Sequence, residues 1–222
     1  MDLQRVFEKI YIKDAQSGYV FSPTLDACNT NQDYVVRHGL GYSRFLHNEN
    51  AVDADLCVFV PQDSPVKVSY LTLKNTDETA RKFCLAYALT PVLGQRLDDA
   101  RFVTTRYQDG VLYAENVCNA EFAGLTAFAA CSGPVQSYTG DGRGFQVRTA
   151  GFPNAILAER LDEKVGAGIP PVMALQTEVT LEPGEEKQIV FVFGQAKTGQ
   201  ADSLARQFTQ LDYGKQSLLQ TV

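Results

Sequence analysis

The sequence contains no tryptophan and only two histidines, His38 and His47. A nucleophilic site that pairs serine or cysteine with histidine would have to use one of these two, and no Gly-x-Ser-x-Gly nucleophile elbow occurs. The histidines stand nine positions apart, which is a poor basis for a metal site, so we predict none. We expect His38 to be a hydrogen-bonded structural group.

Long apolar runs are also missing. No window approaches 18 consecutive apolar residues, and the first five residues lack the charged-then-apolar form of a secretory signal. The five cysteines are an odd number without a Cys-x-x-Cys pair, which favours buried free thiols over disulfides. These features predict a cytoplasmic protein, with no membrane contact by this segment.

An excess of basic residues is lacking as well. Twenty Lys and Arg stand against 26 Asp and Glu, which gives a formal net charge of −6 and a pI near 5.0. Such a chain repels the phosphate backbone, on which sequence-independent nucleic-acid affinity depends. We therefore expect no nucleic-acid partner.

The sequence is rich in β-strand signal. Short runs of Val, Phe, Tyr and Thr recur between Gly, Pro, Asn and Asp, and this pattern predicts an all-β chain. The clearest predicted strands are residues 56–60, 66–73, 83–89, 102–107, 111–115, 122–130, 173–181 and 188–194. With no internal repeat and no linker, we expect one large antiparallel β domain.

Several local patterns sharpen this prediction. The run 66–73 changes parity in its middle, so it either carries a bulge or is buried on both faces. Asp109-Gly110 favours a tight hairpin, and Pro183-Gly184 favours a second turn that would make 177–181 and 188–193 neighbours. Apolar spacing predicts helices at 154–162 and 202–211. Residues 212–222 carry no turn signal, and we expect a natural chain that runs on.

Three segments carry residue types suited to chemistry. Residues 116–122 combine two asparagines and a carboxylate with a phenylalanine, groups that bind sugar hydroxyls; the structural alternative is that the asparagines form turns and Glu121 caps or pairs with an arginine. Residues 140–144 resemble a phosphate loop only superficially and are expected to be a flexible loop, although Arg143 can pair with an anion. Asp53 and Asp55 are expected to be solvated edge charges.

Collinear blocks along the chain resemble a known family. They are Gly-Tyr-Val-Phe-Ser-Pro-Thr at 18–24, the run 34–45, and residues 59–61, 63–67, 73–76, 119–123, 166–168, 174–176, 181–184 and 193–196. In this order they resemble the N-terminal β-sandwich of glycoside hydrolase family 94, formerly glycosyltransferase family 36. Nearly the whole chain is covered.

The resemblance implies a fold and a division of labour. It implies a large antiparallel, galactose-mutarotase-like supersandwich over residues 1–195 and the start of a helical linker over 196–222. In complete enzymes an (α/α)6 barrel follows and carries the catalytic acid, so we expect no catalytic residue here and little activity from this chain alone. Family members include inverting phosphorylases and cyclic β-1,2-glucan synthases. Phosphorylases use inorganic phosphate as co-substrate and need no other cofactor.

The resemblance also implies site residues. We predict sugar-binding roles for Asn119, Glu121, Phe122, Arg44 and Tyr42. A phosphate-binding role for Arg143 is predicted from the guanidinium group alone, which pairs with phosphate bidentately. Cellobiose-type members tend to have arginine-rich residues after the matching glutamate, whereas Ala-Gly-Leu-Thr follows here, which is more like the β-1,2-glucan branch. The predicted partners are a β-linked gluco-oligosaccharide, the catalytic barrel, and a second copy of the chain that covers an apolar patch in a homodimer.

Three functional hypotheses are open at this point. The first is a scaffold and partial sugar-site wall in a phosphorylase or cyclic-glucan-synthase-like enzyme. The second is a free-standing, non-catalytic sugar-binding module, which requires exposed rings; missing tryptophan weakens it, although tyrosine can substitute. Its candidate rings are Tyr42, Tyr107, Tyr138 and Phe145. The third is a mutarotase-type enzyme in which a histidine converges with Glu121 or Asp55.

Overall fold

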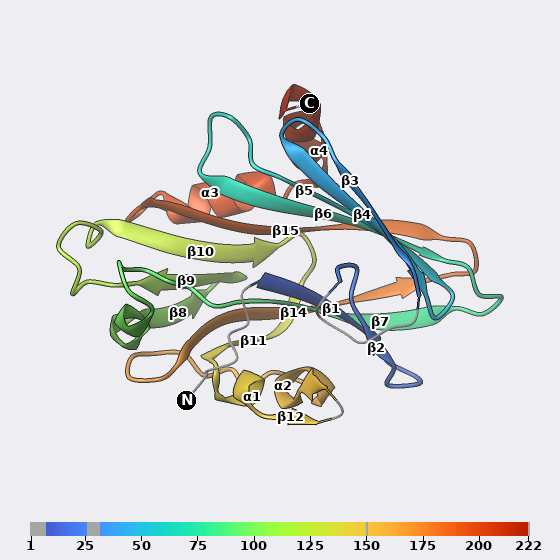
Figure 1. The fold of residues 1–222 in the computed structure, drawn as a ribbon, viewed down its shortest axis with the longest axis horizontal. Coiled ribbons are helices and arrows are strands. Elements are labelled where there is room, and N and C mark those ends of the chain that lie inside the picture. The colour runs from blue at the N-terminus through green and yellow to red at the C-terminus, as the bar shows by residue number, and fades with distance from the viewer. Residues whose placement is uncertain (1–7, 26–31, 150, 222) are drawn as a thin grey trace.

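The computed structural model describes residues 8–25, 32–149 and 151–221. Two large antiparallel sheets pack face to face in the described part (Figure 1). One sheet has eight strands, in the order β3 (Tyr34–His38), β4 (Tyr42–Glu49), β5 (Val52–Phe59), β6 (Val66–Asn75), β15 (Glu186–Lys197), β10 (Leu125–Cys131), β9 (Val111–Glu115) and β8 (Thr104–Gln108). The other has five, in the order β11 (Val135–Asp141), β14 (Pro171–Leu181), β7 (Arg81–Leu89), β1 (Glu8–Asp14) and β2 (Val20–Phe21). The predicted antiparallel supersandwich with C-terminal helices is confirmed.

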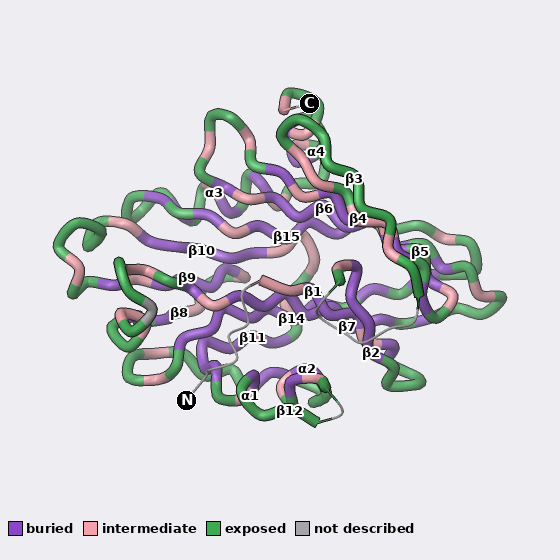
Figure 2. Tube along the Cα trace, viewed as in Figure 1, coloured by how far each residue is buried: buried purple, intermediate pink, exposed green. Residues whose placement is uncertain are grey.

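Short helices and a small ribbon complete the described chain. They are η1 (Leu97–Phe102), α1 (Arg143–Gln146), β12 (Arg148–Thr149), β13 (Phe152–Pro153), α2 (Asn154–Leu157), α3 (Ala201–Phe208) and α4 (Leu211–Thr221). Helices α3 and α4 cover the outer face of the eight-stranded sheet, while α1 and α2 lie against the outer face of the five-stranded sheet (Figure 1). Each sheet therefore buries side chains on both of its faces, and buried residues run along the central strands of both sheets (Figure 2).

Strand β6 carries apolar side chains on both of its faces. Val66, Val68 and Tyr70 belong to the apolar cluster under α3, whereas Leu71 and Leu73 belong to the cluster between the sheets. The pairing of β6 with β5 and β15 runs without a register shift. Of the two explanations for the parity change, burial on both faces is therefore the correct one.

The turn at Pro183-Gly184 joins the two sheets rather than two neighbours in one sheet. Gly184 has a φ of +74°, and the Glu185 amide donates to the Glu182 carbonyl at 3.0 Å, so the predicted turn forms. Strand β14 pairs with β7 and β11, however, while β15 pairs with β6 and β10. The prediction that these two strands are neighbours in one sheet was wrong, because pairing with distant strands decides which sheet each one joins.

Other local predictions need smaller corrections. The predicted helix at 154–162 is a single turn, α2, and the helix at 202–211 is α3 followed after a break by α4. Phe102 ends η1 instead of starting a strand, and Phe122 lies in the turn before β10. Residues 140–144, expected to be a flexible loop, form the end of β11 and the start of α1. The Asp109-Gly110 hairpin is confirmed, since both residues have positive φ.

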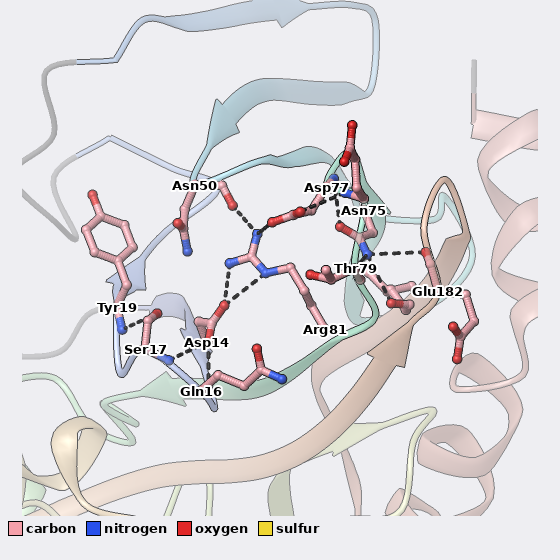
Figure 3. Close-up of polar contacts among 12 residues, drawn as sticks. Asp14, Gln16, Ser17, Tyr19, Asn50, Asn75, Asp77, Thr79, Arg81 and Glu182 are labelled. Atoms are coloured by element: carbon pink, nitrogen blue, oxygen red, sulfur yellow. Dashed lines mark hydrogen bonds and ion pairs between the residues drawn. The ribbon is translucent and has the colours of Figure 1, made fainter.

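Buried polar groups fasten the two sheets together at one end of the sandwich (Figure 3). Arg81 on β7 donates to the Asp14 carboxylate through Nε at 3.0 Å and through Nη2, and to the Asn50 carbonyl in the β4–β5 turn. At the end of β6, the fully buried Asn75 donates to the Leu181 carbonyl at 3.1 Å. Each cluster thus joins a strand of one sheet to a loop or strand of the other.

The described cysteines are free thiols. Cys57, Cys84, Cys118 and Cys131 form no disulfide, and Cys28 lies outside the described residues. Burial raises the pKa of the Cys57 and Cys84 thiols and raises that of Cys131 to about 12. Cys118 differs from the other three because it is exposed.

Candidate functional site

A surface depression opens where the β9–β10 turn faces η1. Its volume is about 420 Å³, and it is lined by Gln95, Arg96, Asp99, Phe102, Asn116, Cys118, Asn119 and Ala120. The two contributing segments are joined through β8 and β9, which form the edge of the eight-stranded sheet. We call this feature the β9–β10 depression.

Asparagine side chains shape one wall of the depression. Asn116 is buried, donates from Nδ2 to the Leu93 carbonyl at 2.6 Å, and accepts from the Cys118 amide at 3.1 Å. Asn119 Oδ1 accepts from the Glu121 amide at 3.1 Å. Both asparagines therefore form the turns of the structural alternative. The Nδ2 group of Asn119 has no protein partner recorded among the described residues, so it is available to a ligand.

The η1 segment supplies the opposite wall. The Arg96 amide donates to Asp99 Oδ2 at 2.9 Å, which fixes the start of η1. Phe102 is 41% exposed, and the Arg101 guanidinium lies 4.7 Å from its ring centroid. The sequence analysis did not identify Arg96 and Asp99 as site residues and assigned Phe102 to a strand. The adjacent acidic residues Asp98 and Asp99 were the available signal for the start of a helical turn here.

The depression combines donors, acceptors and an apolar ring. A guanidinium and an amide NH₂ donate hydrogen bonds, a carboxylate and an amide oxygen accept them, and a phenyl ring offers an apolar face. A few convergent polar groups beside an aromatic surface are typical of small-molecule sites. A polyhydroxylated ligand has both the hydroxyl groups and the C–H faces that this set can contact.

Glu121 and Phe122 lie on the same turn, next to the depression. Glu121 is exposed, and its carboxylate makes no recorded hydrogen bond or ion pair with a described residue, so the alternative that it pairs with an arginine is not realised there. Phe122 is 37% exposed, and its backbone completes the turn by accepting from the Leu125 amide at 2.9 Å. The structure thus brings three predicted sugar-binding residues, Asn119, Glu121 and Phe122, into one turn.

Tyr42 and Arg44 lie elsewhere, on β4. Four strand-to-strand steps separate β4 from β10, which amounts to roughly 19 Å at about 4.8 Å per step. Arg44 Nε donates to Asp55 Oδ1 at 2.7 Å, and this side-chain hydrogen bond raises the pKa of Arg44. Tyr42 is half-buried, with its ring over Gly39, where an added Cβ would come within 2.1 Å. The structure does not place these two residues with the other three.

Arg143 occupies a third location, on α1 beside the five-stranded sheet. Its guanidinium donates to Asp141 Oδ1 at 2.9 Å and to Oδ2 at 2.8 Å. Hydrogen bonding by Arg143 is the main reason why the pKa of Asp141 is lowered. The arginine charge is therefore already matched by a carboxylate, and phosphate binding there stays a prediction.

The two histidines are separate from all of these residues. His47 is buried, stacks on Tyr34 with ring centroids 3.8 Å apart, and pairs with Glu49 at 2.9 Å. His38 is exposed and contacts the Ser43 hydroxyl at 2.9 Å. In the described residues neither ring contacts Glu121 or Asp55, which counts against the mutarotase-type hypothesis. The sequence analysis did not predict the His47–Glu49 pair, although these residues are two positions apart on one strand and therefore lie on the same face.

The proposed stacking rings are largely unavailable. Phe145 is buried, and Tyr107 stacks on Tyr138 with centroids 3.6 Å apart, both half-buried. Tyr42 is also half-buried. This arrangement counts against the hypothesis of a free-standing sugar-binding module built on those four rings.

Two packed sheets with helices over both outer faces place this chain in the class of large antiparallel supersandwiches. The model of the family described as "Glycosyl hydrolase 94, supersandwich domain" matches residues 3–211. The chain therefore belongs to that family, and the recognised resemblance is confirmed. None of the helices in the described ranges is long and apolar enough to span a membrane.

Curated relatives agree with this assignment. The chain is 31% identical over 201 residues to the cyclic beta-(1,2)-glucan synthase NdvB of Rhizobium meliloti (strain 1021), which covers 87% of this chain and 7% of that protein. It is 25% identical over 215 residues to the N,N'-diacetylchitobiose phosphorylase of Vibrio furnissii, covering 91% of this chain and 27% of that protein. The chain thus spans between 7% and 27% of the length of these two relatives.

Solved structures share the fold. A bacterial glucoamylase complexed with acarbose aligns with a TM-score of 0.57 at 12% identity, covering 96% of this chain and 30% of that one. A putative kojibiose phosphorylase from the human microbiome aligns with a TM-score of 0.52 at 12% identity, covering 96% and 26%. At this level of identity the likeness concerns the fold alone.

Proposed function

We propose that this chain is the supersandwich domain of an enzyme that acts on β-linked gluco-oligosaccharides, and that the β9–β10 depression forms part of the wall of its sugar site. The observation that carries the proposal is the convergence of Asn119 with Arg96, Asp99 and Phe102. The relatives whose names specify a cyclic β-1,2-glucan or diacetylchitobiose support this substrate class.

The roles of the chain in that enzyme are those of scaffold and sugar wall. The exposed Glu121 and Phe122 extend the wall beyond the depression, and catalytic acid chemistry belongs to a barrel domain of the parent enzyme. Where the parent is a phosphorylase, inorganic phosphate is its co-substrate, and the phosphate attacks as an anion that needs no general base. The Ala-Gly-Leu-Thr run at 123–126 favours a β-1,2-linked sugar.

An amide-shift titration tests the proposal. Sophorose, cellobiose and longer β-glucans are added to the chain, with and without inorganic phosphate, and the same titrations are run on Asn119→Ala and Glu121→Ala. We expect saturable shifts at residues 95–102 and 116–122 with sophorose, and weaker binding in both variants. Glu159→Ala, an exposed change beside the other sheet, is the matched control and should bind normally.

Two results would contradict the proposal. One is the absence of shifts in both segments with every sugar, and the other is an unchanged affinity in both variants. The phosphate arm tests the Arg143 prediction separately: a saturable shift at residues 141–144 supports that prediction, and a flat response rejects it.

A further inference from the structure

A second cavity lies between the β8–β9 hairpin and the start of α3, at a different place from the β9–β10 depression. Its volume is about 180 Å³, and it is lined by Arg106, Gln108, Asp109, Tyr113, Gly199, Ala201, Asp202 and Arg206. We call it the hairpin–α3 cavity. It lies on the face of the eight-stranded sheet that α3 covers, because Tyr113 and Ala201 belong to the apolar cluster of that face.

The polar groups of the cavity are held in place before any ligand arrives. The Arg106 guanidinium lies 3.8 Å from the centroid of the Tyr113 ring. Arg206 Nε donates to both carboxylate oxygens of Asp202, at 3.0 and 2.9 Å. The Tyr113 hydroxyl donates to the same Asp202 carboxylate at 3.4 Å. These contacts restrict the side chains of Arg106, Asp202 and Arg206 before a ligand binds, which lowers the cost of association.

The charges of the cavity balance. Hydrogen bonding by Arg206 lowers the pKa of Asp202, and burial raises the pKa of Tyr113. The lining thus combines the guanidinium groups of Arg106 and Arg206, the carboxylates of Asp202 and Asp109, and the phenol of Tyr113. The two guanidinium groups would repel a cationic ligand, and the two carboxylates would repel an anionic one. The lining therefore suits a neutral ligand that carries many hydroxyl groups.

The size of the cavity limits the ligand further. Its volume equals that of about six water molecules at roughly 30 Å³ each, and it lies below the roughly 300 Å³ at which drug-sized sites begin. One sugar ring is of this order. Gly199, with a φ of +92° and no neighbour within 4 Å of an added Cβ, keeps the rim open.

We propose that the hairpin–α3 cavity is a second carbohydrate subsite that binds one ring of a neutral β-linked glucan. The choice of glucan rests on the proposed function, whereas the site and its preference for a neutral polyol rest on its own residues. Tyr113 on β9 and Asn116, the first residue after β9, are three positions apart, about 10 Å at roughly 3.3 Å per residue. A glucan of several residues is long enough to reach from this cavity to the β9–β10 depression.

An amide-resolved titration of the full chain with methyl β-D-glucopyranoside and sophorose tests this site. We expect saturable shifts at residues 106–113 and 199–206. Arg106→Ala and Gln108→Ala change exposed side chains, and each should weaken binding at this cavity about tenfold, the loss expected when one hydrogen bond to the ligand is removed. Shifts at residues 116–122 should persist in both variants. Arg148→Ala, an exposed arginine on the other sheet's side, is the control and should change nothing.

The possible outcomes separate the two proposals. Shifts at residues 116–122 without shifts at the cavity overturn the second subsite and leave the proposed function intact. Shifts at the cavity alone support the subsite and contradict the sugar wall at the β9–β10 turn. Unchanged affinity at the cavity in both variants overturns the subsite, and so does a response there to inorganic phosphate in place of sugar.

Discussion

The buried carboxylate of Asp14 makes the stability of the folded state depend on pH. Its side chain is 3% exposed and that of Arg81 is 7% exposed. Burial alone would raise the pKa of Asp14, but the Ser17 and Gln16 amides and the Arg81 guanidinium together outweigh burial and lower it. The ionised carboxylate therefore stabilises the folded state.

This lowered pKa predicts the acid dependence of stability. The stabilisation is fully present above the unfolded-state pKa of about 3.9 and is lost as pH falls through the folded-state value. Asp14→Asn should lower the free energy of unfolding at pH 7 by roughly 3 kcal/mol, because the buried Arg81 loses its main carboxylate partner and keeps the Asn50 carbonyl and the more distant Asp77, at 3.9 Å. Urea unfolding from pH 7 to pH 2 should show a smaller acid loss in the variant. An acid loss equal to that of wild type contradicts this assignment, and Asp63→Asn, an exposed loop change, is the control.

Cys118 provides a chemical probe of the β9–β10 depression. It is exposed and lines the depression, whereas burial raises the pKa of Cys57, Cys84 and Cys131. Because the thiolate is the reactive form, we expect Cys118 to be the first of these four to react with maleimide at neutral pH. Bound sophorose should slow this reaction, as peptide mapping would show. Labelling of Cys118 at the same rate with and without saturating sugar would count against the sugar wall.

At the scale of elements, α3 seals the outer face of the eight-stranded sheet. Phe208 is 1% exposed and meets Tyr213 of α4 edge to face, with centroids 5.0 Å apart. Phe208→Ala should lower the free energy of unfolding by about 3–5 kcal/mol, measured by urea denaturation. The exposed neighbour Gln207→Ala should have little effect. If Phe208→Ala unfolds like wild type, α3 is not part of the cooperative unit.

The same elements show how far the sequence determines the fold. Local signals predicted the turns at Asp109-Gly110 and Pro183-Gly184, whereas the parity change in β6 left a bulge and burial on both faces open until the strand pairing was known. The sheet that each strand joins does not follow from local signals, because the paired residues of β14 and β7 are at least 84 positions apart and those of β15 and β6 at least 112. The apolar stripe at 154–162 reflects packing on the five-stranded sheet: Leu161 is buried there outside any helix, with its amide held by Ser137 Oγ at 3.0 Å.

The candidate site was predictable to a similar extent. Asn119, Glu121 and Phe122 were identified because amide, carboxylate and aromatic groups occur together within one short segment. Their partners Arg96, Asp99 and Phe102 were not, since only the tertiary fold brings η1 against the β9–β10 turn. Tyr42 and Arg44 were predicted from the resemblance to belong to the same site, but the width of the eight-stranded sheet separates them from the β9–β10 turn.

At the scale of the whole molecule, the two most exposed large apolar side chains of the described residues lie near the described C-terminal end. Leu40 at the β3–β4 hairpin is 91% exposed and Leu219 on α4 is 75% exposed. The hairpin and α4 meet there, since a Cβ on Gly41 would lie 2.9 Å from Thr221 (Figure 1). Apolar clusters of this kind mark contact surfaces.

We predict that this surface supports self-association of the chain. Sedimentation velocity should show a concentration-dependent dimer that Leu40→Asp dissociates, because a charge cannot be buried unpaired in an apolar contact. Val147→Asp, an exposed change on the other side of the sandwich, should leave the dimer intact. A wild-type chain that sediments as a monomer at every concentration would contradict the prediction.

The most direct test of the central claim is a crystal structure of the chain with sophorose at a concentration that saturates the amide shifts. The account predicts a sugar ring in the β9–β10 depression, with hydroxyl groups about 3 Å from the Asn119 amide and the Asp99 carboxylate and a ring face against Phe102. A depression without sugar in a crystal that holds sophorose elsewhere, for example against Tyr42 and Arg44 on β4, would contradict it.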